Sequence, residues 1–353
     1  MKIFCFTRFG QLGASSRLRL MQFLPWFSPS VTLTVVSPLF DDSMLLRKYQ
    51  HGSYNVITLI STYLRRLYLL VTSNNFDLIW IEKEALPWLP IWIEKWFLQK
   101  GSYILDYDDA IFHSYDLHRF SLVRFFYGRK IDHLMEGSRL VIAGNNYLAS
   151  RAIAAGARWV EVIPTVIDIT RYSPKNNYSF LSMLRIVWIG SPSTVQYLLE
   201  LKDSLSHLAK FHLFTLRVIG VSAISIPGII IEFFPWSLDS EAALIGECDI
   251  GIMPLKDTPW EQGKCAYKLI QYMACGLPVV ASPIGANLNV VINGETGLFA
   301  NSKASWIAQL EILLKDATLR KRFGDRGRLR VEAEYSLQKI APQLVQLLKV
   351  AAG

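Results

Sequence analysis

The stretch from Lys256 to Ala286 reads KDTPWEQGKCAYKLIQYMACGLPVVASPIGA, and its pattern decides the fold. Apolar residues just before it, at 249–254, predict a strand. A polar loop then leads into a helix predicted over 264–274, which Gly276 ends. A second apolar strand follows directly at 278–281. The stretch is therefore a strand–loop–helix–strand unit.

Two lysines stand near the start of this predicted helix. Lys264 and Lys268 are four residues apart, so they would share one helix face and repel each other. They would also lie at the positive end of the helix dipole, where cations are disfavoured and phosphates bind readily. An anion held between them would remove both penalties. The pattern indicates a phosphate site, with two solvated lysines on an exposed face as the alternative.

The run from Gln271 to Ser282, QYMACGLPVVAS, resembles the segment EAMACGxPVVAS of retaining glycosyltransferases of family 4. The preceding TPWEQGK, from Thr258 to Lys264, resembles one subgroup of that family. The resemblance implies the GT-B fold, in which two Rossmann-like α/β domains with doubly wound parallel sheets face each other across a cleft. It also implies a retaining enzyme that moves a sugar from a nucleotide-diphosphate sugar to a polysaccharide or lipid-linked acceptor in cell-surface glycan synthesis.

The length and rhythm of the chain suit two domains. Its 353 residues are 51% hydrophobic and 19% charged, a globular composition, and strand patterns alternate with helical ones in both halves. The segment 162–174 resembles the close of the family's first domain, and the polar run 175–179 predicts a linker. We expect an acceptor-side domain over 1–177, a nucleotide-sugar domain over 178–335, and a helix over 336–353 that returns toward the first domain.

The overall charge favours anionic partners. Lys and Arg outnumber Asp and Glu by 37 to 29, which gives a net charge of +8. The basic residues are scattered in small groups, which argues against a nucleic-acid partner. The four cysteines and six histidines show no metal-ligand spacing, so no metal and no cofactor beyond the nucleotide-sugar co-substrate are expected. The cysteine pattern also suits a reducing cytoplasm, and neither a signal peptide nor a transmembrane run is predicted.

The expected donor site departs from the family pattern in its charges. Members usually carry an Arg and a Lys after the strand that corresponds to 184–190, but this chain has neither between Gly190 and Glu200. Lys264 and Lys268 are therefore expected to hold the donor diphosphate. Neutral donors would come from the loop and helix start that follow the strand. These donor residues are Ser191, Ser193 and Thr194.

The family's pair of glutamates, eight residues apart, is also missing. Gly263 and Gln271 stand at the two positions. The amide of Gln271 can still bond ribose hydroxyls. Glu261, in the loop, is the candidate replacement for the first carboxylate. Because both glutamates are lost, a non-catalytic protein that binds nucleotide sugars is one alternative function.

Carboxylates follow the strand predicted over 102–106, at the place where many family members carry His-Asp. Asp108 or Asp109 is expected to contact a sugar hydroxyl or to accept the acceptor's proton, with His113 as the fallback. The alternative is that these aspartates cap the next helix. Asp106 and Asp108 also form a DxD pattern, which would bind a metal in a GT-A enzyme, so a metal-dependent GT-A-like transferase is a second alternative.

A glycine-containing loop follows the first strand, as at the start of Rossmann-like units. The resemblance implies that this loop faces the cleft, near the donor or the acceptor. Ser15 and Ser16 are expected to cap a helix that begins near Arg17. Gly13, Ser15 and Arg17 are therefore candidate cleft residues, and Arg19 is a further candidate anion contact.

Two segments of the first half predict contact with a membrane surface. Residues 86–98 form an apolar segment with three tryptophans, too short to cross a bilayer but able to lie in its interface. Residues 124–130 read RFFYGRK, and together with Arg65 and Arg66 they add positive charge. We expect a cytoplasmic protein that is peripheral on the inner membrane, with a buried crossover helix at 86–98 as the alternative.

Overall fold

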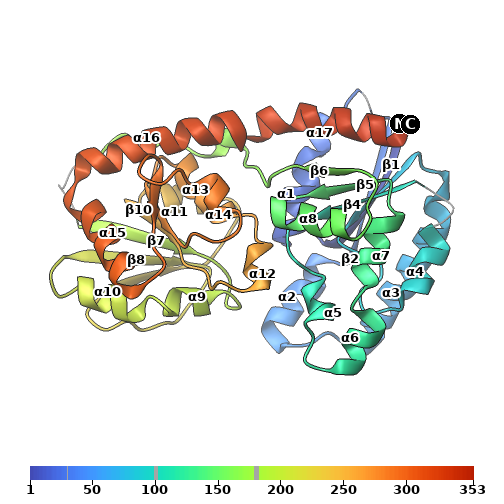
Figure 1. Ribbon diagram of the computed structural model, residues 1–353, viewed down its shortest axis with the longest axis horizontal. Helices are drawn as coiled ribbons and strands as arrows, with labels where there is room; N and C mark the ends of the chain where they lie inside the picture. Colours follow the sequence, from blue (N-terminus) through green and yellow to red (C-terminus); the bar gives the residue numbers. More distant parts are fainter. Residues whose placement is uncertain (30, 99–101, 179–182) are drawn as a thin grey trace. The chain divides into compact units, whose positions relative to one another are not determined.

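The computed structural model describes residues 1–29, 31–98, 102–178 and 183–353. The chain divides into two compact units, and each is built around one parallel sheet (Figure 1). Unit 1 comprises Met1–Thr165, Gln262–Cys265 and Ile340–Gly353, whereas unit 2 comprises Val166–Glu261 and Ala266–Lys339.

The sheet of unit 1 has six parallel strands in the order β2-β1-β3-β4-β5-β6. The two central strands β3 and β4 are buried along their whole length, because helices cover both faces of such a sheet. Their sequences, LIWIE and YILDY, are accordingly almost continuous apolar runs that end in polar residues. The strands are β1 (Lys2–Phe9), β2 (Leu33–Phe40), β3 (Leu78–Glu82), β4 (Tyr103–Tyr107), β5 (Leu140–Ala143) and β6 (Val160–Val162).

Helices connect successive strands of unit 1. The predicted helix caps at Ser15 and Ser16 are wrong, because the first helix already begins at Ala14 with Gly13 at its N-cap. The first half of the unit contains α1 (Ala14–Arg19), η1 (Met21–Trp26), α2 (Asp42–His51), α3 (Val56–Thr72), η2 (Ser73–Asn75) and α4 (Ile91–Leu98). The second half contains α5 (His113–Asp116), α6 (Ser121–Tyr127), α7 (Lys130–Gly137), α8 (Asn146–Ala154) and most of α17 (Leu337–Ala352).

The sheet of unit 2 also has six parallel strands, in the order β12-β11-β10-β7-β8-β9. The strands are β7 (Leu184–Ile189), β8 (Phe214–Ile219), β9 (Ile230–Phe234), β10 (Ile250–Met253), β11 (Val279–Ala281) and β12 (Gly297–Phe299). The helices are η3 (Ile169–Arg171), α9 (Val195–Leu199), α10 (Lys202–Leu208), α11 (Glu241–Gly246), α12 (Pro259–Gln262), α13 (Tyr267–Ala274), α14 (Asn287–Val290), α15 (Lys303–Lys315) and α16 (Ala317–Glu334).

Two apolar cores flank this second sheet, one on each face. Successive side chains of a strand point to opposite faces, so neighbouring residues of β7 join different cores. Ile186 and Trp188 pack with α10 and α15, whereas Val187 and Ile189 pack with α13. The prediction of two doubly wound parallel sheets is confirmed. In each unit, the carboxyl ends of the strands meet at one edge, where ligands bind in this class of fold.

Candidate active site

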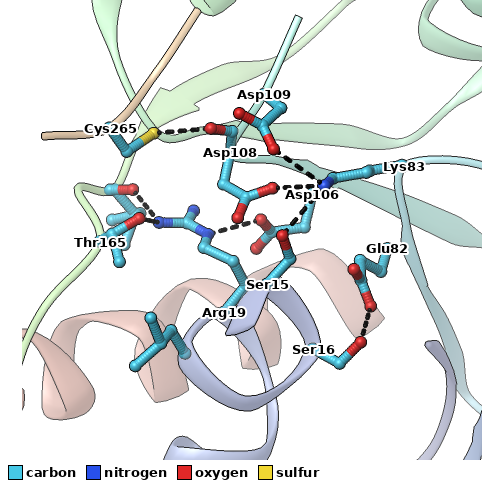
Figure 2. A network of polar contacts seen from close by, with 12 residues as sticks. Ser15, Ser16, Arg19, Glu82, Lys83, Asp106, Asp108, Asp109, Thr165 and Cys265 are labelled. Atoms are coloured by element: carbon cyan, nitrogen blue, oxygen red, sulfur yellow. Dashed lines mark hydrogen bonds and ion pairs between the residues drawn. The ribbon is translucent and has the colours of Figure 1, made fainter. Parts of the chain in front are cut away.

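Lys83 forms the centre of a buried polar cluster at the carboxyl edge of the sheet in unit 1 (Figure 2). It follows β3 with a left-handed backbone at φ +64°. Its Nζ lies 2.9 Å from Asp108 Oδ1, 3.4 Å from Asp109 Oδ2 and 3.0 Å from Ser15 Oγ. The lysine side chain is only 8% exposed, so its charge is offset by these two carboxylates rather than by water.

The two aspartates of this cluster differ in proton affinity. Burial favours the neutral form of both carboxyls, and the Lys83 ammonium opposes it. For Asp108 the ammonium prevails, with help from a hydrogen bond to Ser15, and its pKa falls below the ordinary value. For Asp109 burial prevails, the neighbouring Asp108 charge adds to it, and its pKa is raised. Asp109 is therefore the carboxyl of the pair that is better suited to accept a proton.

A second buried ion pair lies beside this cluster. Arg19 Nε donates to Asp106 Oδ1 at 2.7 Å, and Arg19 Nη1 donates to the carbonyl of Ile163 at 2.8 Å. Both partners of the pair are 2% exposed, and burial raises the pKa of Asp106 to about 6 despite the arginine. The expectation that Arg19 contacts a bound anion is wrong, because a carboxylate inside the protein already occupies it.

The glycine-containing loop and the start of α1 lie beside the Lys83 cluster in unit 1. Gly13 packs so tightly that an added Cβ would lie 2.3 Å from the Cβ of Phe9. Ser15 faces Lys83, as expected of a site residue, while Ser16 donates to Glu82 Oε2 at 2.6 Å. Arg17 is buried, and its Nη1 donates to the carbonyl of Gln11.

Residues Gln262–Cys265 belong to unit 1, although the surrounding sequence belongs to unit 2. Asn145 holds this segment, because its Nδ2 donates to the carbonyls of Gln262 at 3.2 Å and of Lys264 at 3.0 Å. Cys265 Sγ donates to the carbonyl of Asp108 at 3.2 Å, and burial raises the pKa of the thiol, which keeps it protonated. The positive charge of Lys264 partly opposes the rise in the pKa of Asp109. Lys264 therefore acts at the edge that carries the aspartates.

His113 lies at the start of α5 with both ring nitrogens engaged. Its Nδ1 lies 2.7 Å from Asp116 Oδ1, and its Nε2 lies 2.8 Å from the hydroxyl of Tyr147. The side chain is largely buried. It belongs to this hydrogen-bonded row rather than to the Lys83 cluster.

In unit 2, the serine–threonine loop closes the end of β7. Thr194 Oγ1 accepts from the backbone N–H of Ser191 at 3.1 Å, and the hydroxyls of Ser191 and Ser193 lie 2.8 Å apart. The next loop approaches closely at Gly220, where φ is +92° and an added Cβ would lie 2.2 Å from the carbonyl oxygen of Gly190. Only glycine fits there, so the backbones of the two loops pack directly against each other at the edge of the sheet.

Lys268 lies in the first turn of α13, and its Nζ lies 4.5 Å from the ring centroid of Trp188. The helix begins at Tyr267 after Ala266, which has φ +54°. Lys264 therefore lies outside the helix, and the predicted pair of lysines on one helix face is wrong. The two lysines also belong to different compact units.

The two candidates for the missing glutamates lie in the interior of unit 2. Glu261 on α12 is 6% exposed and accepts hydrogen bonds from the hydroxyls of Tyr197 and Thr258. Gln271 on α13 is 2% exposed, and its Nε2 donates to the hydroxyl of Tyr172 at 3.1 Å. A ribose hydroxyl would have to compete with Tyr172 for this amide.

Sequence reasoning missed Lys83 and Tyr197. Lys83 directly follows the buried strand at the carboxyl edge, so the strand-end rule that singled out the aspartates could have found it. Tyr197 carried no signal, because its bond to Glu261 joins residues 64 positions apart. Among the described residues, no group of three or more His, Cys, Asp and Glu side chains could hold a metal ion.

Each unit has the Rossmann-like architecture of one domain of a GT-B protein, and solved GT-B structures match nearly the whole chain. Anabaena Alr3699/HepE, solved with UDP-glucose, superimposes with a TM-score of 0.74 and 16% identity, covering 99% of this chain and 100% of that one. WaaG, a glycosyltransferase involved in lipopolysaccharide biosynthesis, gives a TM-score of 0.69 with 12% identity and covers 98% and 99%. The alternative of a GT-A-like enzyme is wrong, because the fold is GT-B and Arg19 occupies Asp106 of the DxD pattern.

Part of the second unit is similar to known glycosyltransferases. Residues 183–316 match the family described as Glycosyl transferases group 1. In addition, 78 residues are 36% identical to the capsular polysaccharide biosynthesis glycosyltransferase CapM of Staphylococcus aureus. That match spans 21% of this chain and 20% of the length of CapM.

Proposed function

We propose that this protein is a retaining glycosyltransferase of family 4. It would move a sugar from a nucleotide-diphosphate sugar to a polysaccharide or lipid-linked acceptor in cell-surface glycan synthesis. The observation that carries the proposal is the group 1 glycosyltransferase domain at residues 183–316, within a GT-B fold. Similar structures solved with UDP and UDP-glucose support the donor class, and the partial likeness to CapM supports the acceptor class.

Retention at the sugar's anomeric carbon is part of this proposal. Such a transfer must stabilise charge on the leaving diphosphate and on the oxocarbenium-like sugar. The proton NMR coupling constant of the product's anomeric proton tests retention directly. A product with the donor's configuration supports the assignment, whereas an inverted product would contradict it.

In the donor half of the mechanism, cations and N–H groups offset the diphosphate charge without a protein-bound metal. Lys264 and Lys268 are proposed as the cations. Ser191, Ser193 and Thr194 add hydroxyl and backbone donors at the end of β7. Each charge-assisted bond would strengthen as the leaving oxygen gains charge.

Replacing Lys264 or Lys268 with Ala is expected to weaken binding of a nucleoside diphosphate by roughly 10- to 100-fold. Loss of one charge-assisted hydrogen bond costs about 1.5–3 kcal/mol, and each 1.4 kcal/mol is a factor of ten. Isothermal titration with UDP, GDP and their sugars measures the effect. Lys339, an exposed lysine at the end of unit 2, gives the matched control Lys339→Ala with unchanged affinity.

Near-wild-type affinity in both lysine variants would overturn the phosphate assignment. The alternative of a non-catalytic binding protein predicts a different pattern. Such a protein would bind the nucleotide through the same lysines, but it would release no free diphosphate with any acceptor. Transfer that persists in EDTA would support the proposal of a protein-supplied charge and no metal.

On the acceptor side, Asp109 is proposed to accept the proton of the attacking hydroxyl. Its raised pKa and its place at the strand end suit this role. Asp108 stays ionised beside Lys83 and would orient Asp109 or a sugar hydroxyl. Glu261 is proposed to stabilise the sugar, while Gly13, Ser15, Arg17 and His113 would shape the acceptor side.

We also propose that the protein works at the cytoplasmic face of the inner membrane. Trp92 and Trp96 within 86–98, and Phe125 and Phe126 within 124–130, are exposed, as lipid contact requires. No helix among the described residues is long and apolar enough to cross a bilayer. Contact would therefore be peripheral.

A further inference from the structure

Helix α3 buries an arginine beside Leu70 on its inner side and exposes large apolar side chains on its outer side. Arg66 is 2% exposed, and its Nη2 donates to the carbonyls of Thr7 at 2.8 Å and of Ser37 at 3.1 Å. On the same side of the helix, the hydroxyl of Tyr63 donates to the carbonyl of Pro87 at 2.9 Å. These bonds tether the helix to β1, β2 and the loop that precedes α4, so its orientation is fixed.

The opposite face of α3 is an apolar stripe that nothing in unit 1 covers among the described residues. Its members follow one another at spacings of three and four residues, so they lie on one side of the helix. They are between 54% and 78% exposed. The stripe consists of Ile57, Ile60, Leu64, Tyr68 and Val71. Burying an arginine while exposing a row of large aliphatics is the reverse of what water favours, and it indicates an apolar partner for this face.

Neighbouring elements of unit 1 also expose apolar side chains. α3 packs beside α4 (Figure 1). On α4, Trp92 and Trp96 are exposed and lie one turn apart. Tyr63 on α3 contacts Pro87, and the next residue, Trp88, lies 6.5 Å from the ring of Tyr127 at the end of α6. α6 itself exposes Leu122, Phe125 and Phe126. The exposed apolar surface of these three helices is called the apolar face below.

Two of the three segments that form the apolar face are free of acidic residues, and the one carboxylate of the third, Glu94 on α4, is buried. Residues 43–76 and 117–131 contain no Asp and no Glu. The cations in these segments include Arg47, Lys48, Arg65, Arg119, Arg124 and Arg129. A symmetric dimer through this face would place the same cations against each other, because a two-fold interface pairs a surface with itself. A bilayer with anionic lipids attracts them instead, by about 1 kcal/mol for each residue near the surface.

We propose that the apolar face is a bilayer-contacting surface in which α3 lies within the interface of an anionic membrane. The apolar stripe of α3 enters the acyl boundary, the tryptophans of α4 lie at headgroup level, and Arg124 of α6 and the flanking Arg119 and Arg129 contact lipid phosphates. This inference rests on the proposed membrane contact and names its main helix and its lipid class. It does not depend on the transferase chemistry.

Flotation of the full chain with lipid vesicles tests the proposal. We expect binding to POPC/POPG vesicles, weaker binding to POPC alone, and loss of the difference at high salt. The variant Ile60→Gln with Leu64→Gln is expected to lower partitioning by about tenfold or more for each side chain withdrawn from lipid. The matched control is Phe211→Gln with Leu213→Gln, a pair that is equally exposed in unit 2, and it is expected to bind vesicles like the wild type.

The double variant Arg124→Gln with Arg129→Gln separates the electrostatic contribution to vesicle binding from the apolar contribution. This variant is expected to bind POPC/POPG vesicles less tightly and POPC vesicles as before. Unchanged partitioning of the Ile60/Leu64 variant, or an equal loss in the Phe211/Leu213 control, would overturn the proposal. So would a dimer that light scattering detects and that the Ile60/Leu64 variant abolishes without any vesicle binding. Unaltered nucleotide affinity in these variants keeps the result distinct from a failure of the donor site.

Discussion

Replacing Lys83 with Met is expected to destabilise unit 1 by about 3–5 kcal/mol, because the largely buried Asp108 and the partly exposed Asp109 would lose their shared cation. For a protein of this size the melting temperature should fall by roughly 6–20 °C. Burial alone would lower the pKa of Lys83, but Asp108 and Asp109 raise it above its ordinary 10.5. The stabilisation is therefore fully present at neutral pH and is lost only as the pH rises through the folded-state pKa. Thermal unfolding at pH 7 measures the effect.

The matched control for this variant is Lys349→Met, which removes an exposed lysine from α17 in the same unit. It is expected to change the melting temperature by less than about 2 °C, because surface substitutions cost little. A Lys83→Met protein as stable as this control would show that the aspartates do not depend on the lysine. The left-handed backbone at Lys83 would then have no explanation in the cluster.

Replacing Asp109 with Asn is expected to lower kcat/KM for sugar transfer by about 10²- to 10⁴-fold, the usual effect of losing a general base. Because burial raises the pKa of Asp109, the wild-type activity should rise with pH as this carboxyl ionises. The acidic limb of the kcat/KM profile should disappear in the variant. It should also move to higher pH in Lys83→Met, where no ammonium favours the carboxylate. Release of nucleoside diphosphate against pH measures both effects.

Two variants control for indirect effects of the Asp109 change. Asp109→Glu restores the carboxylate and is expected to recover part of the activity. Glu136→Gln removes an exposed carboxylate from α7 and should leave the profile unchanged. Full activity in Asp109→Asn would refute the proposed base, and an unchanged acidic limb would assign that limb to another group.

The sequence pattern was sufficient to predict the two parallel sheets. The apolar runs at 184–190, 214–220 and 249–253 fix strands because parallel strands are buried on both faces, and each lies within a residue of β7, β8 and β10. Because these strands alternate with helical segments along the chain, few chain topologies other than two doubly wound sheets are possible. Local pattern and global fold agree in these regions.

The site was less accessible to sequence reasoning, since its contacts join distant segments. The helix at 267 begins later than its composition suggests, because Ala266 adopts a left-handed backbone and Asn145 holds Gln262–Cys265 within unit 1. Arg19 lies on the helix that follows the glycine loop, a common place for a residue that binds an anion. In the structure it pairs instead with Asp106, which is 87 residues further along the chain. Sequence spacing cannot predict contacts between residues that are so far apart in the chain.

The hydrophobic periodicity of α3 could not predict which face of the helix is buried. Its apolar residues recur at helical spacing, which normally marks a face packed on a sheet. In the structure Leu70 packs inward together with Arg66, whose guanidinium donates to carbonyl groups of β1 and β2, and a second apolar stripe is left outside. A pattern shows that two faces differ, but the hydrogen bonds of the buried arginine decide which face is inside.

A thermal-shift titration with UDP, GDP, ADP and the corresponding nucleotide sugars tests the central claim most directly. We expect one nucleoside diphosphate and its sugar to raise the melting temperature, with about 2.7 kcal/mol of stabilisation at 100 times the dissociation constant. The same shift should persist in EDTA and shrink in Lys264→Ala and Lys268→Ala. No shift with any member of the panel would contradict the account of this protein as a nucleotide-sugar glycosyltransferase.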